Sequence, residues 1–349
     1  MTEGFRGCYT ALVTPMADDA GQSVDYDAFQ QLVEFQLAGG VSGVLAMGTT
    51  GESPTLNWEE HSEVIARVSR FAGGRAVVIA GTGSNSTQEC LASTHHAVEH
   101  GVDAILLVEP YYNGPSSIEI RREYMSPVAA AFPEVDIIPY VIPGRTGTQL
   151  LPEDLALLAA SHANVRAVKE ATGNLDNMRR TRAVCGPTFQ ILSGDDGVTF
   201  DMMVDSSVAA SGVISVVSNV VPGAVHRMTA ALLNGERQEG QRIATGLKPL
   251  FDIVTVKTQE SSPHGQRLCK ARNPLPIKTL MKLLGMPVGA LRRPLGRMTS
   301  AGLERVIEAA WQVWRDNPEF LTPVAQAFGV DLEDRLSDPR YRRGLAYED

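Results

Sequence analysis

Residues 165–184 read VRAVKEATGNLDNMRRTRAV, a short apolar run that ends in lysine, a turn that contains glycine, and a helical segment behind it. Short apolar or β-branched runs that alternate with helical segments of about 10–15 residues are typical of βα units and a parallel sheet. This stretch therefore predicts one βα unit, with Lys169 at the carboxyl end of its strand.

The same unit recurs along the first two thirds of the chain. We expect strands at 7–14, 43–46, 76–80, 104–108, 136–141, 165–169, 189–193 and 212–215, with helices between them, among others at 26–37, 58–71, 87–100, 152–161 and 175–184. An open doubly wound sheet usually has a G-x-G-x-x-G turn after its first strand, but Thr14-Pro15-Met16 stands there. The sequence predicts an α/β fold, a (β/α)8 TIM barrel, over residues 1–235.

A C-terminal helical domain is expected behind the barrel, because the strand signal stops near residue 235. Helices are predicted at 238–254, 276–284 and 301–314, which places this domain at 236–316. The polar stretch 257–272, with Pro263 and Gly265, is expected to be a surface loop or insertion. Residues 317–349 form a C-terminal extension with one short helix near 323–328.

Composition narrows the partners of the protein. A formal net charge of −9 disfavours a nucleic acid, which needs a basic footprint, and favours small-molecule substrates. The longest apolar runs, such as 76–80 and 104–108, are far shorter than the roughly 18 residues that span a bilayer, so no membrane segment is expected. Met1-Thr2-Glu3-Gly4 carries an acid where a secretory signal carries bases, which predicts a cytoplasmic protein.

Neither a metal nor a cofactor is expected. The four cysteines form no C-x-x-C pair, so we expect reduced, packed thiols. His95, His96 and His100 are the only histidine cluster, and they lack the H-E-x-x-H order of a zinc site. A serine hydrolase is not expected either, because the sequence lacks the G-x-S-x-G motif that carries the nucleophile of that class.

Lys169 stands out because this chain has 25 arginines and only six lysines, and no other lysine precedes Lys248. An ε-amine can form an imine with a carbonyl, whereas a guanidinium cannot. A Schiff-base lysine needs a pKa of about 7–8, and a desolvated barrel interior lowers the pKa in this direction. The alternative is a lysine that merely faces solvent at a strand end.

The other predicted strand ends also carry polar groups. Catalytic residues of parallel barrels lie at the carboxyl ends of the strands. Thr49 and Thr50 offer hydroxyls in a glycine-flanked turn, and Tyr112 and Tyr140 are candidate proton shuttles. For each tyrosine alone, core packing with a satisfied hydroxyl is the competing interpretation.

Six motifs in order resemble the dihydrodipicolinate synthase and N-acetylneuraminate lyase family of Schiff-base aldolases, over residues 7–314. They are Gly48-Thr49-Thr50-Gly51-Glu52-Ser53, Pro110-Tyr111-Tyr112-Asn113, Pro143-Gly144-Arg145-Thr146-Gly147, Val168-Lys169-Glu170-Ala171-Thr172-Gly173-Asn174, Ser193-Gly194-Asp195-Asp196 and Asn273-Pro274-Leu275-Pro276-Ile277-Lys278. The resemblance implies a lyase that acts on pyruvate without a cofactor.

By the same resemblance, Lys169 is the imine-forming lysine, and Thr49, Tyr140 and Tyr112 form a proton relay. Tyr112 would reach into the site of a neighbouring subunit. The resemblance therefore also implies a homotetramer built from two tight dimers.

Substrate-binding roles follow from the resemblance as well. Thr50, with the backbone at Gly194 and Ile214, would hold the pyruvate carboxylate, and Arg145 would bind the carboxylate of a second substrate.

The identity of that second substrate is the open point. Thr49-Thr50 and Arg145 resemble the synthase branch, which condenses pyruvate with aspartate semialdehyde. Val141 stands where the family usually has asparagine, and Glu109 where threonine is common. The alternatives are another pyruvate-dependent aldolase or dehydratase acting on a sugar-acid or aromatic-aldehyde adduct, and a non-catalytic barrel that binds a small acid.

Overall fold

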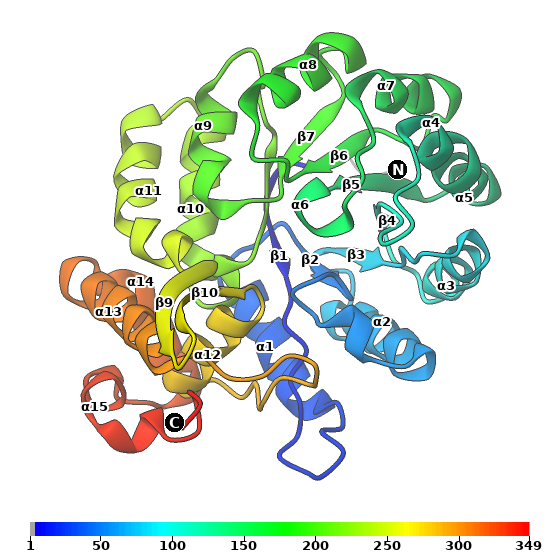
Figure 1. The fold of residues 1–349 in the computed structure, drawn as a ribbon. Coiled ribbons are helices and arrows are strands. Elements are labelled where there is room, and N and C mark those ends of the chain that lie inside the picture. The colour runs from blue at the N-terminus through cyan, green and yellow to red at the C-terminus, as the bar shows by residue number, and fades with distance from the viewer. Residues whose placement is uncertain (1–3, 349) are drawn as a thin grey trace.

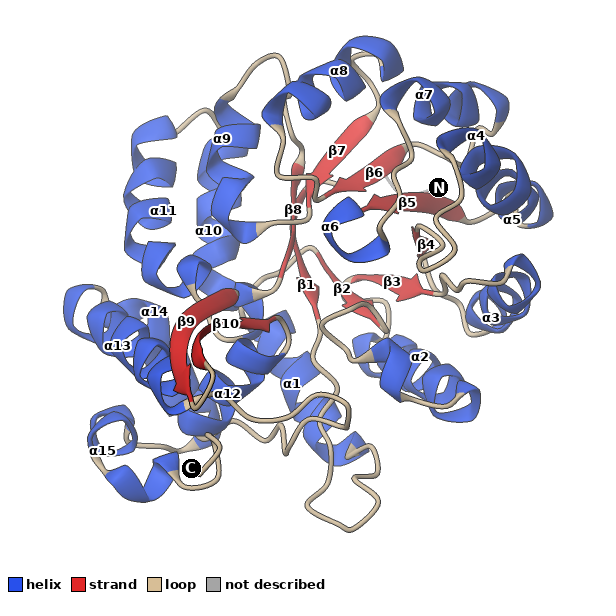
Figure 2. Ribbon diagram, viewed as in Figure 1, coloured by secondary structure: helices blue, strands red, loops and turns tan. Residues whose placement is uncertain are grey.

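Eight parallel strands close into a barrel in the computed structural model, which describes residues 4–348 (Figures 1 and 2). The strands are β1 (Gly7–Ala11), β2 (Gly43–Ala46), β3 (Val77–Gly81), β4 (Ala104–Val108), β5 (Asp136–Val141), β6 (Ala167–Glu170), β7 (Gln190–Ser193) and β8 (Gly212–Ser215). Each pairs with the next along the chain, and β8 returns to β1. The predicted (β/α)8 barrel is confirmed. Residues Met1–Glu3, on which the prediction of a cytoplasmic protein partly rests, lie outside the described part of the chain.

Helices surround the barrel (Figure 2). They are α1 (Tyr26–Ala38), α2 (Trp58–Ala72), α3 (Thr87–Glu99), α4 (Ser117–Glu119), α5 (Ser126–Ala131), α6 (Pro143–Thr146), α7 (Pro152–Ser161), α8 (Leu175–Cys185), α9 (Thr199–Val204) and α10 (Pro222–Leu233). Several of these helices begin at a side-chain cap. The Asn57 side chain and Glu60 form a capping box at the start of α2, and the Asn174 side chain accepts hydrogen bonds from the first turn of α8.

Two apolar cores result from the alternation of side chains along the strands. The inner core fills the barrel and includes Leu106, Ile138, Tyr140 and Ile214. The outer core lies between strands and helices and includes Val141. Neighbouring residues of one strand thus face different environments, and only alternate ones can reach a site inside the barrel.

The C-terminal region packs against the barrel as further helices. They are α11 (Arg237–Asp252), α12 (Leu275–Leu283), α13 (Ser300–Asp316), α14 (Pro318–Phe328) and α15 (Leu332–Ser337). The extension beyond residue 316 holds two helices rather than the single short one predicted. The Phe328 ring of α14 lies 5.2 Å from the Phe35 ring of α1, so the extension is part of the folded body.

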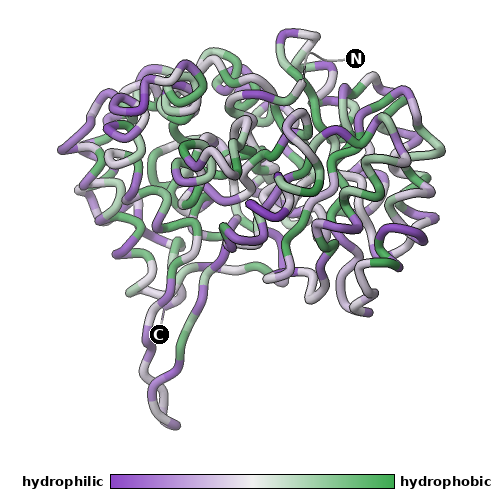
Figure 3. The backbone as a smooth tube through the Cα atoms, turned by 90° about the horizontal axis from the view of Figure 1, so that it is seen from above, coloured by the Kyte–Doolittle hydropathy of each residue, from purple (hydrophilic) through white to green (hydrophobic). Residues whose placement is uncertain are grey.

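Residues 257–272 are not the loop that the sequence predicted. They lie in an antiparallel hairpin of β9 (Thr255–Ser262) and β10 (Gly265–Arg272), which projects from the body as a two-stranded arm (Figure 3). Pro263 lies in its two-residue turn with His264, and Gly265 begins β10. Val256 and Thr258 are buried at the base of the arm, but the rest of both strands is exposed or only partly buried, so the arm has no extended alternation of apolar and polar residues that would identify a half-buried strand.

No helix in the described part of the chain is both long and apolar enough to cross a membrane. Of the four cysteines, Cys8 and Cys90 are buried as packed thiols, whereas Cys185 and Cys269 are only partly buried. Between residues 4 and 348 we find no group of three or more His, Cys, Asp or Glu side chains arranged to hold a metal ion.

Candidate active site

Lys169 lies inside the barrel on β6. Its strand neighbour Ala167 belongs to the inner core, and the alternation of the strand directs Lys169 to the same side. The register sets Lys169 opposite Tyr140 of β5 and Leu192 of β7. The lysine is buried, and its Nζ lies 4.2 Å from the centroid of the Tyr140 ring.

The surroundings of Lys169 favour a neutral amine. Burial lowers the pKa of Lys169 to about 7, the Asp196 carboxylate acts in the opposite direction, and the Arg145 charge lowers the pKa further. With a pKa of about 7, about half of the amines are neutral at pH 7, compared with about one in 2,500 for an ordinary lysine. The structure thus provides the lowered pKa that imine formation at Lys169 requires. The sequence showed only that such a pKa would be needed.

Lys278 is the second buried lysine and serves as a comparison. Its Nζ donates to Glu52 at 2.6 Å and to the carbonyls of Thr14 and Ala290 at 2.9 and 3.0 Å. Lys169 makes no hydrogen bond or ion pair within residues 4–348. Of these two buried lysines, only Lys169 therefore has an amine that is free to attack a carbonyl.

Tyr140 and Thr49 meet at the same place. Both side chains line the same cavity, and burial raises the pKa of Tyr140 to about 12, although the neighbouring Arg145 charge and the Thr49 side chain act in the opposite direction. The phenol stays protonated near neutral pH, and Thr49 is close enough to exchange a proton with it. This pair, next to Lys169, provides the donor and acceptor that carbinolamine formation and breakdown require.

Above these groups lies a cavity of about 190 Å³. Its wall includes Thr49, Tyr111, Tyr140, Ile142, Arg145 and Thr146. Arg145 comes from α6, directly after β5, and its Nη2 donates to the Asn273 carbonyl at 2.8 Å. The guanidinium is exposed at the mouth of the cavity, where it can meet an anion.

Thr50 is buried behind the cavity. Its Oγ1 accepts a hydrogen bond from Asn273 Nδ2 at 2.9 Å, and Asn273 Oδ1 is a buried acceptor with no partner among the described residues. Asn273 therefore contacts both Thr50 and Arg145, a role that sequence reasoning missed although its motif was noted.

Gly194 lies next to Lys169, and Ile214 lies within the barrel. A Cβ at Gly194 would stand 3.1 Å from Lys169 Cε and 2.9 Å from Ala171 Cβ, so glycine is required there. The Gly194 N–H already donates to the Glu170 carbonyl at 2.7 Å. Ile214 is buried in the inner core. The structure thus places Gly194 next to the lysine, with its N–H already donating to Glu170, and Ile214 in the inner core of the same barrel.

Tyr112 is not brought together with the other predicted residues. It follows β4 in a left-handed conformation, φ +80°, and is 93% exposed. Its neighbour Tyr111 lines the cavity instead. Within one chain, Tyr112 points to solvent and contributes nothing to the site.

Two acids that had no predicted role are buried close to the site. Asp196 accepts hydrogen bonds from Ser215 and from the Val216 and Val217 N–H groups, and burial raises its pKa to about 6. Its charge is the one that supports protonation of Lys169. The Ser193-Gly194-Asp195-Asp196 motif was the available signal, but only the fold shows which aspartate faces inward.

Glu109 fixes the segment that carries Arg145. Its carboxylate accepts from the Ile142 N–H at 3.0 Å, the Leu150 N–H at 2.6 Å and the Thr146 hydroxyl at 3.1 Å. Burial raises the pKa of Glu109 to about 7. The departure from the family pattern at this position therefore concerns the support of α6, and not a direct substrate contact.

Val141, the other departure, does not line the cavity. Its side chain belongs to the outer core, whereas Tyr140 and Ile142 face inward on either side of it. Any influence of Val141 on the second substrate has to be indirect.

Known proteins resemble this chain over almost its whole length. Residues 4–312 match the model of the dihydrodipicolinate synthetase family. A 4-hydroxy-tetrahydrodipicolinate synthase from Geotalea daltonii is 40% identical over 304 residues, which cover 87% of this chain and 97% of the relative.

Solved structures agree with that match. The 4-hydroxy-tetrahydrodipicolinate synthase from Methylacidiphilum fumariolicum SolV superposes with a TM-score of 0.81 at 33% identity, covering 93% of this chain and all of the other. A chloride-inhibited dihydrodipicolinate synthase from Acinetobacter baumannii, complexed with pyruvate, gives 0.79 at 32% identity and covers 89% and 99%. Fold and site together define an enzyme of the lyase class, and the chain belongs to the dihydrodipicolinate synthetase family.

Proposed function

We propose that the protein is a 4-hydroxy-tetrahydrodipicolinate synthase, which condenses pyruvate with aspartate semialdehyde through an imine on Lys169. The observation that carries this proposal is the buried, unpaired amine of Lys169 beside the ring of Tyr140, which lines a cavity whose wall also includes Arg145. No cofactor is needed, because the imine itself withdraws electrons from the pyruvate carbon.

The chemistry uses groups that already lie in place. The neutral Lys169 amine adds to the ketone carbon of pyruvate, and protons pass through Tyr140 and Thr49 as water leaves to give the imine. Transfer of a methyl proton to the Tyr140 and Thr49 pair converts the imine to an enamine, whose carbon attacks the aldehyde. The alkoxide formed takes up a proton, and the amino group of the semialdehyde part then displaces Lys169 from the imine carbon, which closes the ring and frees the lysine. Thr50 and the backbone near Gly194 and Ile214 are the proposed site of the pyruvate carboxylate.

Arg145 is the proposed contact for the carboxylate of the semialdehyde. A guanidinium pairs bidentately with a carboxylate, and such charge-assisted pairs are stronger than neutral hydrogen bonds. Neutral aldehydes cannot use this contact. Val141 faces away from the cavity, so it does not select the second substrate by direct contact; apolar side chains such as Leu106 and Val108 line the wall together with Arg145.

A homotetramer built from two tight dimers and a cytoplasmic location belong to the same proposal. The 93% exposure of Tyr112, an aromatic side chain held at a strained φ, supports a shared site in which a neighbouring subunit covers it. The relay would then consist of Thr49, Tyr140 and the partner's tyrosine.

Initial rates with pyruvate and one of four aldehydes test the assignment. Aspartate semialdehyde is expected to give the highest kcat/KM, ahead of N-acetylmannosamine, glyceraldehyde and an aromatic aldehyde. A neutral aldehyde that exceeds the semialdehyde would refute the synthase assignment and favour another aldolase of this family. Absence of any pyruvate adduct after borohydride reduction would favour a non-catalytic barrel that binds small acids.

A further inference from the structure

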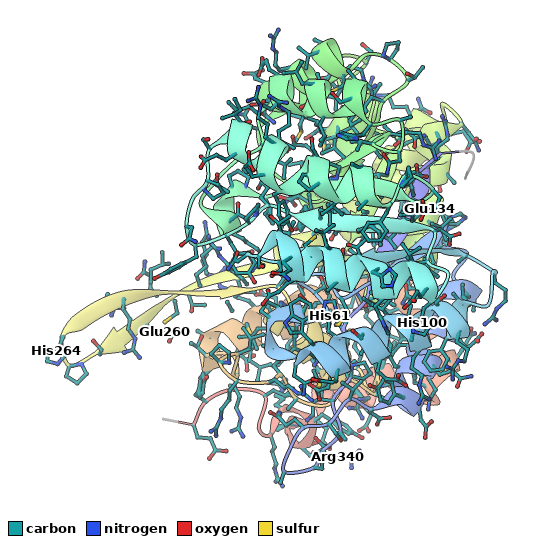
Figure 4. The ribbon with its side chains drawn as sticks, turned by 90° about the vertical axis from the view of Figure 1, so that its right-hand side faces the viewer. His61, His100, Glu134, Glu260, His264 and Arg340 are labelled. Carbon is teal, nitrogen blue, oxygen red and sulfur yellow. The ribbon has the colours of Figure 1, made fainter. Side chains whose placement is uncertain are left out.

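The β9–β10 arm has two chemically different faces. In its register Lys257 lies opposite Lys270, Arg272 opposite Thr255, and Arg267 opposite Glu260. Because side chains alternate along each strand, Lys257, Lys270 and Arg272 project from one face and Glu260 and Arg267 from the other. Figure 4 shows the arm side-on, with His264 at its tip and Glu260 on its shaft.

The face formed by Lys257, Lys270 and Arg272, called the cationic face below, has no compensating acid. All three side chains are exposed, and none makes an ion pair with a carboxylate within the described chain. Like charges directly opposite each other destabilise a hairpin, so the Lys257–Lys270 pair is unfavourable for folding alone. On the other face, Arg267 and Glu260 balance each other.

The cationic face ends at the cavity. Arg272 Nη1 donates to the Gly144 carbonyl at 3.0 Å, and Arg145 Nη2 donates to the Asn273 carbonyl at 2.8 Å. These reciprocal contacts join the base of the arm to α6. The Arg272 charge, followed by burial, Lys257 and Arg145, lowers the pKa of Lys270, in keeping with four cations close together.

The remainder of the protein repels anions. With a formal net charge of −9, the chain opposes the approach of a negatively charged substrate, and a local positive strip that leads to the site offsets this repulsion. A row of charges that extends into solvent can act on a substrate before it reaches the cavity.

We propose that the cationic face of the arm is a capture surface for small carboxylates, which it guides to Arg145 at the mouth of the cavity. For the second substrate the inference rests on the proposed function. For pyruvate it needs only imine formation at Lys169.

Two variants on the same strand separate this role from general charge effects. Lys270→Gln removes a charge from the cationic face, and Arg267→Gln removes one from the opposite face as the matched control. The double variant Lys257→Gln/Lys270→Gln enlarges the effect, and Lys270→Arg restores the charge. The second-order rate of imine formation with pyruvate is measured by quenching with borohydride.

At an ionic strength of about 0.01 M, where the Debye length is about 30 Å, Lys270→Gln should slow imine formation about two- to fivefold, and the double variant more. The deficit should shrink at about 0.15 M, where the Debye length is about 8 Å. It should appear in kcat/KM rather than kcat. Arg267→Gln and Lys270→Arg should follow the wild type.

Equal salt dependence in Lys270→Gln and Arg267→Gln would overturn the proposal, as would a loss that persists unchanged at high salt. A changed oligomeric state with unchanged capture rates would also overturn it, in favour of an interface between copies. If the wild type forms no pyruvate adduct at all, the proposed function fails instead, so the two failures are distinguishable.

Discussion

The Nζ atom of Lys278 lies 2.6 Å from Oε1 of Glu52, and both side chains are completely buried. Glu52 ends the turn that carries Thr49 and Thr50 and adopts a left-handed conformation, φ +58°. Its other oxygen accepts from the Arg292 N–H at 2.9 Å. Through this one buried carboxylate, α12 and the segment that follows it hold the turn that carries Thr49 and Thr50.

Removal of this contact is expected to destabilise the protein. Lys278→Met leaves Glu52 buried and without its cation, so the free energy of unfolding should fall by about 3–5 kcal/mol. Urea denaturation measures it. The double variant Lys278→Met/Glu52→Gln, which removes the unpaired charge, should recover part of the loss. If both variants are equally unstable, the ion pair is not the cause.

Lys169 is expected to be the only site of imine formation. Borohydride and pyruvate should add one reduced adduct, which peptide mass analysis should locate at Lys169. Lys169→Ala should fold and lose turnover, and Lys169→Arg should not restore it, because a guanidinium cannot form the bond. An adduct at Lys248, Lys278 or Lys282 would contradict the mechanism.

The pH dependence of imine formation should report the pKa of Lys169. The protonated amine cannot attack, so the rate should fall about tenfold per pH unit well below pH 7 and level off above it, since burial brings the pKa to about 7. Arg145→Ala removes a cation that lowers this pKa, so the midpoint should move to higher pH. Arg145→Lys keeps the charge and should retain the wild-type midpoint. A wild-type midpoint near 10 would show that Lys169 is not desolvated.

Arg145 should affect the second substrate more than pyruvate. Arg145→Ala should leave borohydride trapping above pH 8 nearly intact, since the amine is then mostly neutral. It should lower kcat/KM for aspartate semialdehyde. The corresponding activation free energy should rise by about 1.5–3 kcal/mol, the contribution of a hydrogen bond to a charged group. Steady-state kinetics with each aldehyde measure this. An equal loss with a neutral aldehyde would show that Arg145 does not recognise the carboxylate.

Mixed oligomers test the role of Tyr112. Lys169→Ala and Tyr112→Phe should each be poorly active as homo-oligomers. When they are combined, some sites receive an intact lysine from one chain and an intact tyrosine from the other, so part of the activity should return. Verified mixed oligomers without any recovery would show that the site is not shared.

Much of the site could be predicted from the sequence. A (β/α)8 barrel places its strand ends on one face, so the order of the βα units was enough to group Lys169, Tyr140 and Thr49. The scarcity of lysine then singled out Lys169. The outward direction of the Val141 side chain also follows from the period-two alternation along the strand, once Tyr140 is known to face inward.

Other features depended on contacts between residues far apart in the chain. The arm at 255–272 pairs two mostly polar strands, of which only Val256 and Thr258 are buried, and so few buried positions leave no hydrophobic pattern that records the pairing. The Lys278–Glu52 bond and the contacts of Asn273 join segments more than 200 residues apart. The sequence by itself determined the barrel and singled out Lys169 at a strand end, because local periodicity and residue chemistry encode them. The tertiary structure alone decided the pKa of that lysine, the support of the catalytic turn and the cationic face, because burial and the proximity of charges exist only in the folded chain.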